Sequence, residues 1–196
     1  MEKIILIGGG GHCKSCIDVI EQQGKFQIAG VVDLPEKSTQ SVMGYTVLGS
    51  DSNLSELVKS CQNVLITLGQ IKSPVRRIEL FKYLKTIGAV FPVIQSPLAY
   101  VSPHALVEEG TIVMHHALVN SDANVGRNCI INTKALVEHD AVVGDHCHVS
   151  TGAIVNGGVK IGNGSFFGSG AVSKEYISIP FNSFISANSL IAKTHD

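Results

Sequence analysis

A six-residue repeat of aliphatic and small residues runs from Ala105 to Ala171 with few interruptions. The aliphatic position holds, in order, Val107, Val113, Val119, Val125, Ile131, Val137, Val143, Val149, Val155, Ile161 and Phe167. A small residue follows four positions after most of these, and Gly or Asn often follows directly, as at Asn120 and Gly126. A period of this kind indicates a stacked repeat architecture.

The repeat can be interpreted as one side of a three-sided coil. Val and Ile suit a short strand whose side chain fills the axis, and small residues let neighbouring segments approach closely. Gly or Asn directly after the aliphatic residue tolerates the positive φ that a sharp corner requires. Three sides make a coil of about eighteen residues, so the tract predicts roughly four coils of a parallel β-helix.

The first half of the chain has a different hydrophobic pattern, in which short apolar runs alternate with segments of helical periodicity. The expected strands are 3–7, 27–32, 64–68 and 90–94, and the expected helices are 13–23, 52–60 and 74–86. This order predicts a Rossmann-like α/β domain with a short parallel sheet. A segment with two prolines, 96–103, suits a linker. We therefore expect an α/β domain over residues 1–95 and a β-helix over residues 96–196.

Composition narrows the class of function. The formal net charge is −1 and no long basic run occurs, so neither nucleic acid nor a membrane surface is expected as a partner. No stretch of eighteen apolar residues occurs, and the apolar start is too short for a signal peptide, which predicts a cytoplasmic protein. Its five cysteines, including the pair Cys13 and Cys16, are expected to be free thiols.

A glycine run, Gly8 to Gly11, lies between the first expected strand and helix. Such a loop places backbone N–H groups and a helix N-terminus against a phosphate. Cys13 replaces the last glycine of the dinucleotide fingerprint, which favours a mononucleotide or a nucleotide sugar over NAD. Asp33 ends the second strand, where an acidic side chain often contacts a ribose or base. Alternatively, the glycines only permit close helix packing and Asp33 only begins a turn.

Within the repeat, His139 stands between Glu138 and Asp140. A carboxylate bonded to one imidazole nitrogen would fix the tautomer and raise the basicity of the other, as a general base requires. The spacing leaves open which carboxylate turns toward the ring. Gly157 lies eighteen residues later and is expected to stack over His139, so an N–H of the run 156–158 could face an oxyanion.

Three motifs carry a resemblance to a known family: the loop ending Gly10-Gly11-His12, the string 138–140, and His148-Val-Ser-Thr-Gly-Ala. With them the chain resembles the hexapeptide-repeat acyltransferases of the sialic-acid O-acetyltransferase type. It is most similar to bacterial N-acetyltransferases that modify nucleotide-linked 4-amino sugars. The resemblance extends over nearly all of the chain and implies that the β-helix is left-handed.

The resemblance also implies roles for particular residues. His139 is expected to be the general base, Asp140 the carboxylate that orients it, His148 a neighbour of acetyl-CoA, and Gly157 the amide that holds the thioester carbonyl. The residues expected to bind the nucleotide sugar are Gly10, Gly11, His12, Asp33 and Gly69. No metal ion is expected in the site.

The expected reaction transfers the acetyl group of acetyl-CoA to the amine of a nucleotide-linked 4-amino-4,6-dideoxy sugar, with UDP preferred to GDP as the nucleotide. The resemblance implies a homotrimer with CoA in the grooves between protomers. His139 and His148 are nine residues apart, half a coil, so they face different directions and a site shared between protomers is expected.

Three alternatives stay open at this point. The same fold and base could acetylate a hydroxyl of a sialic-acid-like sugar. A hydratase of the γ-carbonic-anhydrase type would instead hold zinc with three histidines, for which His115, His139 and His148 are candidates. A non-catalytic binding or scaffold protein would need neither chemistry.

Overall fold

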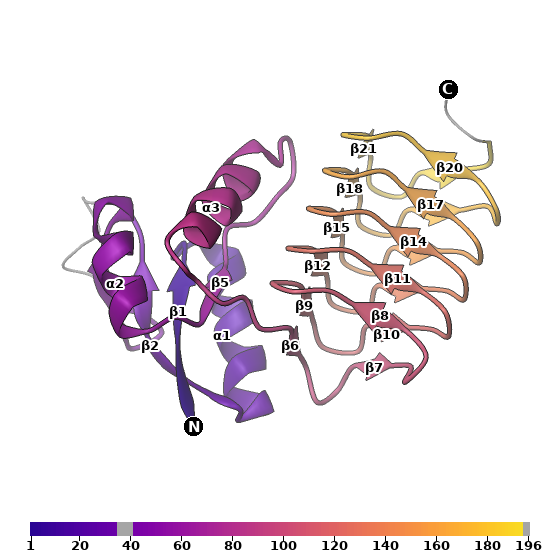
Figure 1. Ribbon diagram of the computed structural model, residues 1–196. Helices are drawn as coiled ribbons and strands as arrows, with labels where there is room; N and C mark the ends of the chain where they lie inside the picture. The colour runs from indigo at the N-terminus through magenta and orange to yellow at the C-terminus, as the bar shows by residue number, and fades with distance from the viewer. Residues whose placement is uncertain (35–40, 194–196) are drawn as a thin grey trace.

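The computed structural model describes residues 1–34 and 41–193, which form an α/β unit followed by a long prism (Figure 1). The α/β unit contains β1 (Glu2–Ile7), α1 (Gly11–Gln23), β2 (Phe26–Val32), β3 (Ser41–Val42), β4 (Tyr45–Gly49), the 3₁₀ turn η2 (Asp51–Asn53), α2 (Leu54–Ser60), β5 (Val64–Ile66) and α3 (Val75–Thr86). Its sheet has the order β3-β4-β2-β1-β5, and every pairing is parallel except β3 with β4. The Rossmann-like α/β prediction is confirmed.

Two details of the α/β unit differ from the sequence prediction. Strands β3 and β4 form a hairpin at the edge of the sheet. The sequence did not predict it, because these residues show no clear alternation of apolar and polar positions. The predicted strand 90–94 is wrong, because Val90 makes only an isolated bridge to Asn63, and Ile94 already pairs with Ile112 of the prism. The pairing of the prism therefore begins two residues before residue 96.

The prism is a left-handed parallel β-helix of two-residue strands. Its strands are β6 (Ile94–Gln95), β7 (Tyr100–Val101), β8 (Leu106–Val107), β9 (Ile112–Val113), β10 (Leu118–Val119), β11 (Asn124–Val125), β12 (Ile130–Ile131), β13 (Leu136–Val137), β14 (Val142–Val143), β15 (His148–Val149), β16 (Ile154–Val155), β17 (Lys160–Ile161), β18 (Phe166–Phe167), β19 (Val172–Ser173), β20 (Ser178–Ile179), β21 (Phe184–Ile185) and β22 (Leu190–Ile191). In the described residues two faces have six strands and one has five, so the prism has between five and six coils. This exceeds the roughly four coils expected for the repeat tract 105–171 because pairing continues on both sides of that tract.

We number the faces by their sheets. Face 1 is β6-β9-β12-β15-β18-β21, face 2 is β7-β10-β13-β16-β19-β22, and face 3 is β8-β11-β14-β17-β20. The register is eighteen residues per coil, as in the pairing of Leu118 with Leu136. The second residue of each strand points into the axis, so Val119 and Val137 are fully buried. Cys129 and Cys147 occupy small inward positions as buried free thiols, as predicted.

The corners correct one expectation about backbone conformation. Positive φ falls three residues after the aliphatic position, for example at Asp122 and Asn128, and not directly after it. Asn at the earlier position instead accepts a hydrogen bond from the next N–H, as Asn120 Oδ1 does from Ser121 at 2.8 Å. Gly is needed at the earlier position for space: a Cβ on Gly144 would lie 2.8 Å from the backbone nitrogen of Asn163 in the next coil.

One hydrophobic cluster spans the two units, beside the separate core along the prism axis. Helix α1 packs Ile17 and Ile20 against Ile94, Ile112 and Ile130, the outward residues of the first coils of face 1. The later coils of the prism rise past the α/β unit (Figure 1). No helix in residues 1–34 and 41–193 has the length and apolar character needed to cross a membrane.

Candidate active site

His139 and Asp140 form a hydrogen-bonded pair at the corner between faces 2 and 3. His139 Nδ1 lies 2.8 Å from Asp140 Oδ2, and about half of each side chain is exposed. Asp140 has a positive φ of 59°, the left-handed conformation in which Asp is better tolerated than most residues. The hydrogen bond to Asp140 raises the pKa of His139, and the Nε2 atom is left for a substrate proton.

Glu138 has a separate task, which settles the choice that the sequence left open. Its Oε2 accepts a hydrogen bond from Asn120 Nδ2 of the preceding coil at 2.7 Å and a longer one, 3.3 Å, from the backbone N–H of His139. Glu138 therefore secures the corner, while Asp140 orients the imidazole.

Gly157 lies directly over the His139 ring, as the eighteen-residue period predicted. A Cβ at this position would be 2.7 Å from His139 Cε1 and 2.8 Å from Nε2, so no larger residue fits without movement of the ring. The side chain of Asn156 donates to the carbonyl oxygen of Ser173 rather than capping the following N–H. Among the described residues, the N–H of Gly157 is therefore left with no hydrogen-bond acceptor.

A second part of the site is a cavity of about 640 Å³ between the α/β unit and the prism. The α/β unit contributes its glycine loop and the segment after β5, and the prism contributes face 1 and its corner with face 2. The lining residues that matter here are Gly10, Gly11, His12, Gly69, Gln70, Asn132, Thr133, His148 and Thr151. Four of the five predicted nucleotide-sugar residues therefore meet, together with His148.

His148 is a buried, neutral side chain in this cavity. Its Nδ1 is 2.5 Å from the carbonyl oxygen of Gln70, and its Nε2 is 3.0 Å from Asn132 Nδ2. These partners require a proton on Nδ1 and a lone pair on Nε2. Burial lowers the pKa of His148 to about 4, and the bond to Gln70 opposes that shift.

His12 lies near His148, with the ring centroids 6.4 Å apart. Burial and the Arg77 charge lower the pKa of His12 to about 3. Its Nε2 is buried and has no hydrogen-bond partner in the described part of the chain. A buried polar atom without a partner is costly, so this nitrogen is suited to a ligand group.

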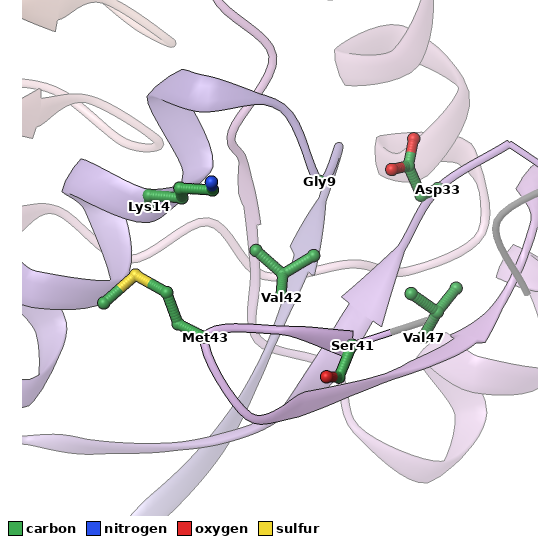
Figure 2. Close-up of a pocket in the computed structure, with 7 residues that line it drawn as sticks. All are labelled: Gly9, Lys14, Asp33, Ser41, Val42, Met43 and Val47. Carbon is green, nitrogen blue, oxygen red and sulfur yellow. The ribbon is translucent and has the colours of Figure 1, made fainter. Parts of the chain in front are cut away.

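Asp33 lines a different cavity, of about 280 Å³ (Figure 2). In the figure, Lys14 of α1 and Asp33 lie on opposite sides of this space, with Val42 between them. Gly9 of the glycine loop also lines this cavity, and a Cβ there would be 2.5 Å from Asp33 Oδ2. Asp33 also lines a space of about 340 Å³ that includes Gly10. The residues predicted to bind the nucleotide sugar therefore line adjoining spaces around the glycine loop.

The sequence analysis missed Gln70, Asn132, Thr133 and Thr151, because nothing in their local pattern marks a cavity. The stacking period offered one signal, since Thr133 and Thr151 are eighteen residues apart and occupy the same corner. Gln70 could not be found this way, because its contacts with His146 and His148 depend on how the two units dock.

The histidines proposed for a zinc site are not brought together within one chain. His115 lies between Asp18 and Ser96, with its two ring nitrogens each 2.6 Å from a side-chain oxygen. His139 is at the corner of faces 2 and 3, and His148 is on face 1. In residues 1–34 and 41–193, no three His, Cys, Asp or Glu side chains are grouped to hold a metal ion.

Comparison with known proteins agrees with this architecture. The family model of the PglD N-terminal domain matches residues 3–84. A search of curated proteins finds no significant match. Among solved structures, a variant of perosamine N-acetyltransferase from Caulobacter crescentus, crystallised with CoA and GDP-perosamine, is 28% identical with a TM-score of 0.92. That match covers 99% of this chain and 90% of the other.

Two further structures extend the comparison. The acetyltransferase domain of PglB from Neisseria gonorrhoeae FA1090, in complex with acetyl coenzyme A, is 27% identical with a TM-score of 0.90, over 98% of this chain and 92% of that one. WeeI from Acinetobacter baumannii AYE has the same fold, with 20% identity, a TM-score of 0.74 and 97% of both chains covered. The chain therefore resembles the hexapeptide-repeat sugar acetyltransferases along its whole length.

The geometry at His139 predicts how its ring titrates. Asp140→Asn should lower the pKa of His139, because the neutral amide no longer stabilises the imidazolium. Glu138→Gln is the matched control and should cause a smaller decrease, because Glu138 is bonded to Asn120. Titration of the ring signals by NMR measures both. A larger decrease in Glu138→Gln than in Asp140→Asn would contradict the assignment of Asp140.

Proposed function

We propose that this protein transfers the acetyl group of acetyl-CoA to the amine of a nucleotide-linked 4-amino-4,6-dideoxy sugar. Whole-length similarity to N-acetyltransferases that bind CoA supports the reaction class. The observation that carries the proposal is the hydrogen-bonded pair His139–Asp140 beneath Gly157, whose N–H has no acceptor among the described residues. We predict that the protein acts in the cytoplasm.

These groups have the geometry that acyl transfer requires. The sugar amine attacks the thioester carbon, and His139 Nε2 takes a proton from the nitrogen as the N–C bond forms. The carbonyl oxygen becomes an oxyanion, which the Gly157 N–H stabilises. The C–S bond then breaks, and the proton passes from the imidazolium to the sulfur of CoA.

We assign the nucleotide sugar to the spaces around the glycine loop. Helix α1 begins at Gly11, its cap residue Gly10 has no side chain, and its first turn contains no acidic residue. Its free N–H groups therefore present a partial positive charge to a diphosphate. Gly9, Gly10 and Asp33 line the neighbouring spaces that suit the nucleoside, while the sugar faces His12 in the large cavity. His148 lines the same cavity and would lie beside both the sugar and the acetyl end of acetyl-CoA.

The sugar cavity and the base lie at different corners of one chain, and a homotrimer would bring them together. Face 2 has an apolar residue at every outward position: Tyr100, Leu118, Leu136, Ile154, Val172 and Leu190. By contrast, helix α1 covers the first coils of face 1, and face 3 carries Asn124, Lys160 and Ser178. Burial of face 2 around a threefold axis would therefore remove more apolar surface from water than burial of face 1 or face 3.

The trimer would complete the site from two protomers. With face 2 of each prism on the axis, the corner between faces 2 and 3 of one protomer adjoins the corner between faces 1 and 2 of the next. The first corner carries His139, and the second carries Asn132, Thr133 and Thr151 at the mouth of the cavity. His139 of one protomer would then act on the sugar held by its neighbour, with CoA in the groove between them.

The reaction itself is tested by assaying release of CoA from acetyl-CoA. We expect turnover with a UDP-linked 4-amino-4,6-dideoxy sugar, and less with the GDP-linked sugar. Free nonulosonic acids test O-acetylation, and mass spectrometry locates the acetyl group on nitrogen or oxygen. Turnover only with a hydroxyl acceptor would contradict the proposed N-acetylation.

The role of His139 is tested by His139→Ala. We expect turnover to decrease by about 10² to 10⁴, the usual contribution of a positioned general base. Lys59→Ala is the control, since Lys59 is exposed near the end of α2 and lines none of the cavities described above. Near-normal turnover in His139→Ala, measured at saturating substrates, would end the assignment.

The trimer is tested by placing a charge on face 2. Leu118→Glu should dissociate the assembly, because three carboxylates would be buried together around the axis. Asn124→Glu, on face 3 of the same coil, should leave it intact. Sedimentation at micromolar concentration measures the mass, and a monomeric wild-type protein would contradict the trimer. Loss of the trimer should also abolish turnover, because His139 and the sugar then belong to separate particles.

A further inference from the structure

Arg77 of helix α3 is a buried cation held by both units of the protein. Its side chain is almost inaccessible, with 2% of the residue exposed. Nη1 donates to the carbonyl oxygens of Ile66 at 2.8 Å and Leu68 at 2.7 Å. Nη2 donates to Asn128 of the prism, at 2.9 Å to its carbonyl oxygen and 2.7 Å to Oδ1.

The cost of burying this charge requires an explanation. In the described residues, Arg77 has no carboxylate partner, and its Nε is buried without an acceptor. Burial lowers the pKa of Arg77 to about 10, so it remains protonated at neutral pH. A buried charge with only neutral acceptors contributes little to stability compared with an apolar side chain of similar size. Its geometry offers a better reason for its presence.

The four acceptors lie behind the two walls of the sugar cavity. Ile66 and Leu68 flank Thr67, whose hydroxyl donates to the carbonyl oxygen of Gly8 at 2.6 Å, and they lead into the segment 69–71 that lines the cavity. On the opposite wall, Asn128 Nδ2 lies 3.0 Å from Nδ1 of His146, two residues before His148. One guanidinium therefore sets the position of both walls.

We propose that Arg77 is a positioning residue for the acetyl transfer: its guanidinium fixes the segment after β5 against the prism and so holds His148 and the sugar cavity in register. This inference rests on the proposed function. Nη1 and Nη2 point to different units, a division that the planar guanidinium makes possible and a lysine amine cannot reproduce. An offset of about 1 Å in such a wall costs about 10² in rate.

The positive charge of Arg77 also favours the neutral forms of the histidines in the cavity. After burial, its charge is the next cause that lowers the pKa of His12, and it also lowers that of His148. The observed bonds require a neutral His148 ring, since its Nε2 must keep a lone pair for Asn132. The same charge lies behind a cavity assigned to a diphosphate sugar, which it would attract.

The decisive variant is Arg77→Lys, which keeps the positive charge but loses the simultaneous hydrogen bonds to the α/β unit and to the prism. We expect at least a tenfold loss of affinity for UDP or GDP, whichever nucleotide the wild type binds, with the affinity for CoA changed less than twofold. Lys85→Met is the matched control: Lys85 is also on α3 and also bonds to the prism, through Glu109, but away from the cavity. Isothermal titration measures all three proteins.

Asn128→Gly provides a second route if Arg77→Lys does not fold. Gly tolerates the φ of 52° at this corner, so the variant keeps the backbone conformation and removes the side-chain acceptor of Arg77 together with the Nδ2 contact to His146. We expect a loss of nucleotide affinity in the same direction and smaller. Unchanged nucleotide affinity in a folded variant, or an equal loss of CoA affinity, would overturn the positioning role.

A readout without substrate separates this proposal from the proposed function. The ring nitrogen signals of His148 in NMR spectra report its tautomer and its bonds to Gln70 and Asn132. Arg77→Lys should shift these signals, and Lys85→Met should not. If the wild type binds no nucleotide, the proposed function fails, and unshifted His148 signals in Arg77→Lys would independently overturn the role of Arg77.

Discussion

The stacking of coils in an eighteen-residue register is the constraint on which the site depends. Each residue lies over the one eighteen positions earlier, and the coils are so close that many corners leave no room for a Cβ. At Gly157 this close approach places the backbone over the His139 ring. The same spacing that packs the hydrophobic axis therefore also brings a glycine whose N–H has no acceptor among the described residues next to the proposed base, without a separate loop.

Much of this could be predicted, because a fixed period turns sequence distance into spatial distance. The pairing of His139 with Gly157 follows from a difference of eighteen positions, and the buried Cys129 and Cys147 follow from the pattern of small residues. The period does not predict which of two neighbouring side chains makes a particular hydrogen bond. The choice between Glu138 and Asp140 depends on Asn120 of the preceding coil, whose Nδ2 donates a hydrogen bond to Glu138.

Other features lay outside any local pattern. The cavity exists because α1 docks on face 1, and the role of Gln70 or Arg77 requires knowledge of both units at once. The six-residue pattern is interrupted after Ala171, although the coils continue to β22. At Ser173 a polar side chain takes the aliphatic position, yet the backbone pairing continues, because neighbouring coils supply the hydrogen bonds whatever the side chain.

The two histidines of the proposed site differ in the way that their tasks require. His139 is exposed, bonded to a carboxylate and has a raised pKa, whereas His148 is buried, bonded to neutral groups and has a pKa of about 4. A general base must accept a proton. A histidine in the wall of the cavity must instead keep its tautomer while charged substrate groups bind nearby. A carboxylate partner stabilises the proton that a ring holds during transfer, so these environments favour the proposed assignment of His139 as the base and of His148 as a fixed hydrogen-bonding group in the cavity.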